Sequence, residues 1–279
     1  MTAAVTVRGL TKAYGRHPAV RGLDLDVDDG EIVAILGPNG AGKSTTIEIL
    51  EGHRKRDAGE VSVLGEDPGS AGREWRARIG IVLQETGDFG MLTVRETVRM
   101  FAKCYSTSRD PGDLLDLVGL TASAGKRVRT LSGGQRRRLD VALGIIAMPE
   151  LLFLDEPTTG FDPEARRQFW ELIRALARDG TTILLTTHYL EEAEALADRV
   201  AVITGGRVVA VDSPAQLTAH TTATATVRWR EGGVWREERT DHPTELIRRW
   251  SADGRELDAL TVTRPTLEDA YLQLIGSAC

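Results

Sequence analysis

Apolar and polar positions divide the first part of the chain into strands and helices. Residues 5–7 and 23–27 alternate between apolar and polar side chains, which predicts half-buried strands. Residues 31–36 and 151–154 are almost continuously apolar, the pattern of strands buried on both faces. A further strand is predicted at 182–185. Helical patterns fall at 44–50, over most of 73–126, at 132–148 and at 166–178. Strands that alternate with helices indicate an α/β domain with a largely parallel sheet.

The pattern changes after about residue 211. Two short segments around Glu231-Gly-Gly233 predict a hairpin, and residues 244–250 and 259–263 predict a helix and a strand. A last helix is expected because four apolar side chains share one helical face: Leu267, Ala270, Tyr271 and Leu274. We therefore expect a large domain over residues 3–212 and a small α+β domain over residues 213–279.

Composition narrows the classes of protein that fit. Hydrophobic residues make up 41% and charged residues 27%, which is ordinary globular usage. The formal net charge of −6 disfavours a general nucleic-acid binder, since such proteins carry a basic excess. No apolar run approaches the roughly 18–20 residues of a membrane-spanning helix, and the N-terminus shows no secretory signal. The protein is expected to stay in the cytosol and to cross no membrane by itself.

A glycine-rich loop follows the first buried strand and precedes a helix. Its residues match the phosphate-binding pattern G-x-x-x-x-G-K-[ST]: Gly37, Pro38, Asn39, Gly40, Ala41, Gly42, Lys43 and Ser44, followed by Thr45. Glycines let backbone N–H groups close around phosphate oxygens, the lysine reaches the β- and γ-phosphates, and the serine hydroxyl can bind Mg²⁺. The alternative is a glycine turn with a surface lysine, which the strand–loop–helix context disfavours.

Two carboxylates end the second buried strand, at Asp155 and Glu156. Asp155 is placed to hold Mg²⁺, and Glu156 could polarise a water molecule for attack on a γ-phosphate. A strand that ends in two solvated acids is the simpler alternative. The phosphate-binding loop earlier in the chain favours the catalytic interpretation.

A third motif lies just before that strand: Leu131, Ser132, Gly133, Gly134 and Gln135. Serine and two glycines at a helix start expose backbone N–H groups, a second anion site. An ordinary helix cap and turn would also explain them. The order of the three motifs, however, resembles the ATP-binding cassette (ABC) family over residues 3–212. The resemblance implies the fold of a P-loop ABC nucleotide-binding domain, with a mixed sheet core and a helical subdomain that carries this signature.

The resemblance assigns roles to further residues. Tyr14 resembles the aromatic residue that stacks on adenine, and Gln84 resembles the glutamine that touches Mg²⁺ and faces a transmembrane partner. Asp162 corresponds to the D-loop aspartate at the subunit interface, although Phe161 stands where leucine is usual. His188 resembles the switch histidine at the γ-phosphate. Each of these residues alone would more often be structural, and only their order in the chain favours the functional roles.

The resemblance also implies an assembly and its chemistry. ATP and Mg²⁺ are the expected ligands, with Mg²⁺ held by Ser44, Gln84 and Asp155, and with Glu156 and His188 as the catalytic residues. The signature of one subunit completes the ATP site of another, so the single set of motifs implies a homodimer. Residues 265–274 resemble the closing segment of ATPases from ABC-2 type drug exporters. That likeness implies integral membrane subunits of ABC-2 type, a peripheral location on the cytoplasmic side of the membrane, and no nucleic-acid partner.

Other interpretations stay open. A soluble ABC ATPase that acts on nucleic acid or ribosomes would share the motifs, but such proteins generally carry two cassettes or long insertions. A nucleotide enzyme of another family, such as a kinase, is a third possibility, and the motif at residues 131–135 argues against it. The tail helix could simply pack on its own small sheet. The arginine run at 136–138 is expected to be a solvated helix face, with added positive potential near the γ-phosphate as the alternative.

Overall fold

The structure is a computed structural model that describes residues 3–82, 89–219, 224–252, 254 and 256–277. The chain divides into two compact units, Met1–Ser213 and Pro214–Cys279. Among the described residues, no helix combines the length and the apolar character that a bilayer crossing requires. Each unit is built around a sheet of its own.

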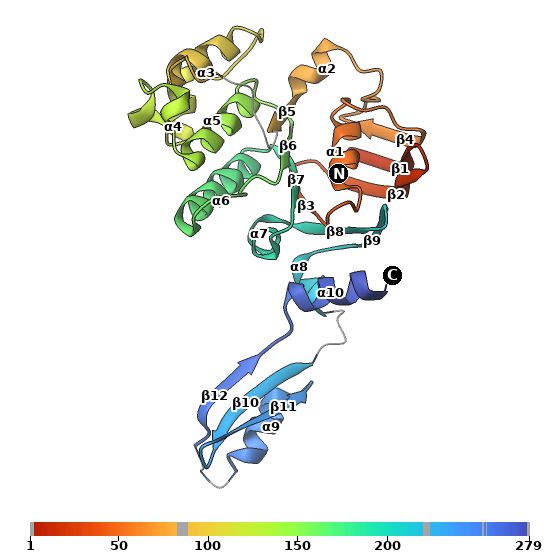
Figure 1. The fold of residues 1–279 in the computed structure, drawn as a ribbon, viewed down its shortest axis with the longest axis vertical. Coiled ribbons are helices and arrows are strands. Elements are labelled where there is room, and N and C mark those ends of the chain that lie inside the picture. Colours follow the sequence, from red (N-terminus) through yellow and green to blue (C-terminus); the bar gives the residue numbers. More distant parts are fainter. Residues whose placement is uncertain (1–2, 83–88, 220–223, 253, 255, 278–279) are drawn as a thin grey trace. The chain divides into compact units, whose positions relative to one another are not determined.

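A six-stranded sheet forms the centre of the first unit (Figure 1). Its spatial order is β5 (Ile79–Val82), β6 (Leu151–Asp155), β7 (Thr182–Thr187), β3 (Ile32–Leu36), β8 (Arg199–Thr204) and β9 (Arg207–Asp212). All neighbours run parallel except β8 and β9, which are antiparallel. Every residue of β3 is buried, as its continuous apolar sequence requires. The α/β class expected from the sequence is confirmed.

Several elements of this unit escape the sequence pattern. The stretch 73–126 was expected to be mostly helical, yet α2 (Arg73–Arg78) passes directly into β5, the edge strand of the central sheet. A four-residue apolar strand next to a helix leaves no separate periodicity to detect. Strands β4 (Ala58–Val63), β8 and β9 also have no counterpart in the sequence prediction.

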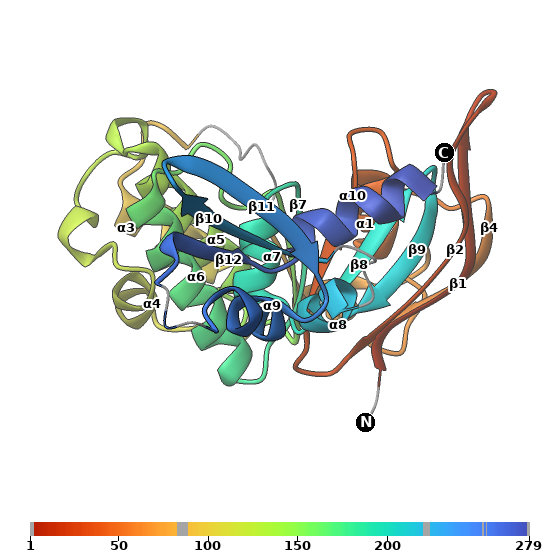
Figure 2. The same ribbon diagram turned by 90° about the horizontal axis from the view of Figure 1, so that it is seen from below.

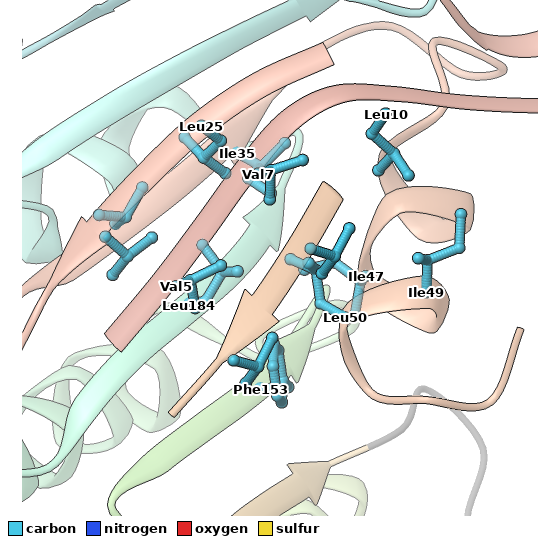
Figure 3. Packing of buried hydrophobic residues seen from close by; sticks show 14 of the residues in the cluster. Val5, Val7, Leu10, Leu25, Ile35, Ile47, Ile49, Leu50, Phe153 and Leu184 are labelled. Carbon is cyan, nitrogen blue, oxygen red and sulfur yellow. The ribbon is translucent and has the colours of Figure 1, made fainter. Parts of the chain in front are cut away.

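A three-stranded antiparallel sheet, in the order β2–β1–β4, covers α1 (Lys43–Leu50). Strands β1 (Ala3–Tyr14) and β2 (His17–Asp28) alternate between buried and exposed residues, so one face is apolar. Figure 3 shows this face, with Val7 and Leu25, packed together with Ile47 of α1 and Phe153 of β6 in one hydrophobic core. The core holds the helix that begins at the glycine-rich loop against the central sheet.

Three helices form a separate layer of the first unit: α3 (Val94–Ala102), α4 (Pro111–Leu117) and α5 (Gly133–Ile145). Figures 1 and 2 both show them at the end of the unit opposite the antiparallel sheet. Short 3₁₀ turns at Thr121–Ser123 and Val128–Thr130 connect α4 to α5. Thr93 and Glu96 form a capping box at the start of α3, which fixes the point where the chain turns into the helix.

Helices α6 (Pro163–Arg178) and α7 (Leu190–Leu196) follow strands β6 and β7, respectively. Asp162 caps α6 and Pro163 occupies its first turn, so the helix begins earlier than the predicted residue 166. Phe169, Ile173 and Leu176 are spaced at helical intervals and are buried. The helix is therefore anchored by one apolar face, and the turn before it carries Asp162.

The second unit contains the small α+β arrangement. Its sheet has the order β11 (Val234–Thr240), β10 (Ala225–Glu231) and β12 (Asp258–Thr263), all antiparallel. Val227, Trp229 and Leu246 of α9 (Pro243–Trp250) form its core. The terminal helix α10 (Leu267–Ser277) contacts α8 (Pro214–Ala219), a helix that the sequence pattern did not predict. The role of this unit in assembly stays a prediction.

Candidate functional site

The glycine-rich loop connects β3 to α1, and its backbone leaves no room for side chains at two positions. A Cβ at Gly37 would lie 2.2 Å from the carbonyl oxygen of Ile203, and one at Gly42 would lie 2.4 Å from that of Ala19. Gly42 also has a φ of 101°, in the left-handed region. These glycines therefore set the shape of the loop, while Pro38 is exposed.

Lys43 is the first residue of α1, at the end of this loop. The residue is only 6% exposed. Its Nζ donates to the carbonyl oxygens of Gly37 at 2.7 Å and Pro38 at 3.2 Å. Burial lowers the pKa of Lys43, while the charges of Glu156 and Asp155 act to raise it. The loop thus holds an amine beside two carboxylates, where a phosphate group would meet a positive charge.

Tyr14 lies at the rim of the loop. Its hydroxyl is 3.4 Å from the Oγ1 of Thr45. The guanidinium of Arg54 lies 5.1 Å from the centre of its ring, and the residue is 43% exposed. The Nζ of Lys12 lies 6.0 Å from the same ring centre, so the ring is accessible beside the first turn of α1 and has two cationic neighbours. The stacking of adenine on Tyr14 stays a prediction.

Asp155 ends β6 and Glu156 follows it, two strands away from β3 in the sheet. The Oδ1 of Asp155 accepts a hydrogen bond of 2.5 Å from the hydroxyl of Thr186. Glu156 adopts a left-handed backbone with φ 44°, and its N–H donates to the carbonyl oxygen of Thr186 at 3.1 Å. A non-glycine residue in this region carries strain of about 1–3 kcal/mol, which the surrounding bonds must offset.

The structure brings Glu156 and His188 together from two distant motifs. His188 follows β7, and its Nδ1 lies 3.4 Å from Oε1 of Glu156. The His188 ring packs against Tyr189 with 4.0 Å between ring centroids, and its side chain is 42% exposed. This pair faces the same edge of the sheet as Asp155, where the carboxyl ends of β6 and β7 meet.

The signature residues form the start of α5. The Ser132 hydroxyl accepts from the N–H of Gln135, and the Gln135 side chain accepts from the N–H of Ser132, which completes a capping box. Gln135 also donates to the hydroxyl of Ser123 at 3.2 Å. Ser132 and Gly133 are exposed, whereas Leu131 and Gly134 are half-buried. The helix start is thus accessible at the surface of this chain.

Arg137 contradicts the expectation for the arginine run. Residues 136–138 were predicted to be a solvated helix face, which is wrong for Arg137 because it is only 7% exposed. Arg137 lies four residues before the buried Val141, so it shares the buried face of α5. Helical spacing therefore held the signal that the sequence analysis missed. Arg136 and Arg138 are half-buried.

Asp162 and Gln84 complete the predicted set. Asp162 is exposed, and its Oδ1 accepts from the N–H of Ala165 at 2.8 Å, so it acts as a helix cap in this chain. Phe161, which replaces the usual leucine, packs edge-on against Phe169 with ring centroids 5.7 Å apart. Gln84 lies outside the described residues. An interface role for Asp162 stays a prediction.

The residues assigned to Mg²⁺ fit its chemistry. Mg²⁺ prefers oxygen ligands and keeps several waters, so it needs few protein groups. The exposed hydroxyl of Ser44 and the carboxylate of Asp155 supply such oxygens. The Thr186 hydroxyl already donates to one oxygen of Asp155, which orients that carboxylate.

Glu51, just after α1, is a buried acid that the sequence analysis did not single out. Burial, together with the charges of Asp155 and Glu48, raises its pKa to about 8. The unfolded chain releases this proton near the ordinary value of 4.5. The folded state therefore binds the proton more tightly, and the free energy of unfolding falls as the pH rises from about 4.5 to about 8.

Replacing Glu51 with glutamine is expected to remove this pH dependence. At pH 8, Glu51→Gln should raise the free energy of unfolding by about 3 kcal/mol, and at pH 5 it should change it little. Urea unfolding without Mg²⁺ or nucleotide measures both values. The exposed Glu60→Gln serves as the control. Equal pH dependence in the parent chain and in Glu51→Gln would contradict the prediction.

The strand–glycine loop–helix unit and the acidic end of β6 define a nucleotide-binding protein of the P-loop class. The family model for the ABC transporter matches residues 20–159. The chain belongs to the ABC transporter family, in which it is an ATP-hydrolysing, ATP-binding subunit. The family expected from the order of the motifs is confirmed.

Curated relatives and solved structures give the same result. The chain is 46% identical over 221 residues to the daunorubicin/doxorubicin resistance ATP-binding protein DrrA of Streptomyces peucetius, covering 77% of this chain and 67% of that protein. It is 37% identical to the daunorubicin resistance ATP-binding protein DrrA2 of Streptomyces coeruleorubidus, covering 98% and 95%. It is 44% identical to the Nod factor export ATP-binding protein I of Ralstonia nicotianae, covering 78% and 70%.

Among solved structures, the chain resembles a dimeric, post-hydrolysis state of the ATP-binding cassette MJ0796 bound to ADP and Pi. The TM-score is 0.67 and the identity 26%, covering 75% of this chain and 98% of that cassette. The likeness to resistance and export ATP-binding proteins and the likeness to a cassette with hydrolysed nucleotide both agree with the ATPase function.

Proposed function

We propose that two copies of this chain close around ATP and drive efflux through separate membrane subunits of ABC-2 type, from the cytoplasmic face of the membrane. The proposed cargo is a drug, antibiotic or other lipophilic compound. One observation carries the dimer. Of the hydrogen bonds, ion pairs and ring contacts described in this chain, none joins residues 131–135 to the loop at 37–45. Each chain thus offers two half-sites that a second copy would complete.

The chain's own residues suit hydrolysis of the γ-phosphate. Loop N–H groups and Lys43 would hold the phosphates, and His188 would contact the γ-phosphate while it pairs with Glu156. Glu156 would accept the proton of the attacking water, since its Oε1 is oriented by His188 and its backbone by Thr186. Mg²⁺, held by Ser44, Asp155 and Gln84, would neutralise phosphate charge when bound.

A groove on the first unit is the proposed docking surface for the membrane subunit. It has a volume of about 630 Å³. Its lining combines apolar and aromatic side chains with acidic and basic ones: Glu51, His53, Arg76 and Asp140. Phe89 and Phe101 pack edge-on in it, with ring centroids 5.3 Å apart. A groove that combines aromatic side chains with charged ones suits an amphipathic helix from a partner protein.

Phe101→Glu is expected to uncouple the subunits. A charge on the groove wall should reduce co-purification of the membrane subunit at least about tenfold, because apolar side chains of that subunit would then pack against a carboxylate. The ATPase rate of the isolated chain should stay within about twofold. Met100→Glu, on the exposed face of the same helix, is the matched control. Undiminished co-purification with Phe101→Glu would place the membrane subunit elsewhere.

The export function has a direct test. The chain is co-expressed with a candidate six-span membrane protein that lacks a cassette, and vesicles are assayed with daunorubicin, the compound named for its relatives. We expect ATP-dependent accumulation that is absent with Glu156→Gln. Failure of the two proteins to associate, or association with a solute-binding import system instead, would contradict the proposal.

A further inference from the structure

Arg137 connects the signature helix to the strand that carries the catalytic carboxylates. Its Nε donates to the carbonyl oxygen of Pro157 at 2.9 Å, and its Nη2 donates to that of Asp155 at 2.8 Å. Both contacts reach across from α5 to the end of β6. The guanidinium thus holds the two carbonyl groups on either side of Glu156.

The backbone of Glu156 is also hydrogen-bonded on its other side, to β7. The N–H of Glu156 donates to the carbonyl oxygen of Thr186, and the φ of Glu156 is 44°. The backbone at Glu156 is therefore fixed from both sides, by Arg137 of α5 and by Thr186 of β7. A strained backbone persists only where the surrounding contacts hold it in place. Here the hydrogen bonds made by Arg137 and by Thr186 hold it.

The environment of the guanidinium suits a fixed position. Burial lowers the pKa of Arg137, while the charges of Asp140, Asp155 and Glu192 act to raise it. The planar fork of an arginine directs two N–H groups to two acceptors at once, which the ammonium of a lysine does not reproduce. The fork of Arg137 therefore suits the two carbonyl groups that it contacts.

We propose that Arg137 is a positioning residue that aims Glu156 and links the two ATP sites of the dimer. The inference rests on the proposed dimer, in which Ser132 and Gln135 at the start of α5 would meet the nucleotide of the second copy. Arg137 lies two residues after Gln135, in the first turns of the same rigid helix. A shift of that helix start would move the Asp155 and Pro157 carbonyl groups, and with them Glu156 of the other site.

The test compares Arg137→Gln and Arg137→Lys with Arg138→Gln, whose side chain hydrogen-bonds Gln168 on α6 instead. Arg137→Gln is expected to lower kcat about tenfold to 100-fold, with ATP affinity within about threefold and a Hill coefficient for ATP reduced toward 1. Arg137→Lys should recover part of kcat. Arg138→Gln should resemble the parent chain. Thermal unfolding confirms that each variant is folded.

Each outcome decides between the possibilities. If Arg137→Gln is folded and keeps the parent kcat and Hill coefficient, the inference is wrong. If Arg137→Gln does not fold, Arg137→Lys decides instead, and full kcat with an unchanged Hill coefficient overturns the inference. Light scattering of Glu156→Gln with ATP tests the dimer separately. A monomer there contradicts the proposed function, whereas a dimer combined with parent-like Arg137 variants contradicts only the role of Arg137.

Discussion

Glu156→Gln is expected to lower the ATPase rate by about 100-fold to 1,000-fold or more while ATP still binds. The amide keeps the size of the side chain and accepts no proton from water. It also keeps an oxygen near Nδ1 of His188, which lies 3.4 Å from Oε1 in the parent chain. Phosphate release under saturating ATP measures the rate, and isothermal titration measures the affinity.

A matched control separates this effect from a change of charge. Glu191→Gln removes one carboxylate from an exposed side chain on α7, which is 80% accessible. Its rate should stay within about twofold of that of the parent chain. Hydrolysis by Glu156→Gln at the parent rate would assign the general base to another residue. A loss of ATP binding would show that Glu156 supports the site rather than the chemistry.

Lys43→Ala is expected to weaken ATP binding by about 10- to 100-fold, because hydrogen bonds to a charged group contribute about 1.5–3 kcal/mol. The parent ammonium is buried among the loop carbonyl groups and lies beside Asp155 and Glu156. Without it, phosphate oxygens would approach these carboxylates with no compensating charge. Titration with a fluorescent ATP analogue measures the change.

Lys55→Ala provides the control, since this lysine is exposed. Its affinity for ATP should match that of the parent chain. Because Lys43 also bonds Gly37 and Pro38, the loop could change shape in Lys43→Ala. Lys43→Arg keeps the charge and tests this point, and thermal unfolding reports the effect on stability. Unchanged affinity in a folded Lys43→Ala would refute the phosphate-binding role of the loop.

The spacing of apolar residues along the chain predicted the buried strands and the amphipathic helices of the fold. The apolar runs of β3 and β6 identified the central strands, because both faces of such strands are buried and every side chain must be apolar. The apolar spacing of α6 identified a surface helix. Strand β5 was not predicted, because four residues next to a helix are too few to show a period of their own.

The candidate site divides in the same way. Gly37, Gly42 and Lys43 belong to one short motif, so the sequence alone predicts a phosphate-binding loop, and the structure shows that the two glycines shape it. Contacts between distant segments were not predicted. Nothing local to Arg137 states that its guanidinium would reach Asp155 and Pro157, and its two arginine neighbours pointed to a solvated face instead.

The sequence by itself determined the family, the α/β class and the order of the motifs, because each motif is a short run whose residue types follow from the chemistry of phosphate binding or from burial. Only the tertiary structure decided which distant groups meet. Glu156 and His188 come together because β6 and β7 are parallel neighbours that end at one edge of the sheet. Arg137 reaches Asp155 and Pro157 because α5 packs beside the end of β6. In both cases, residues far apart in the chain become neighbours only through packing.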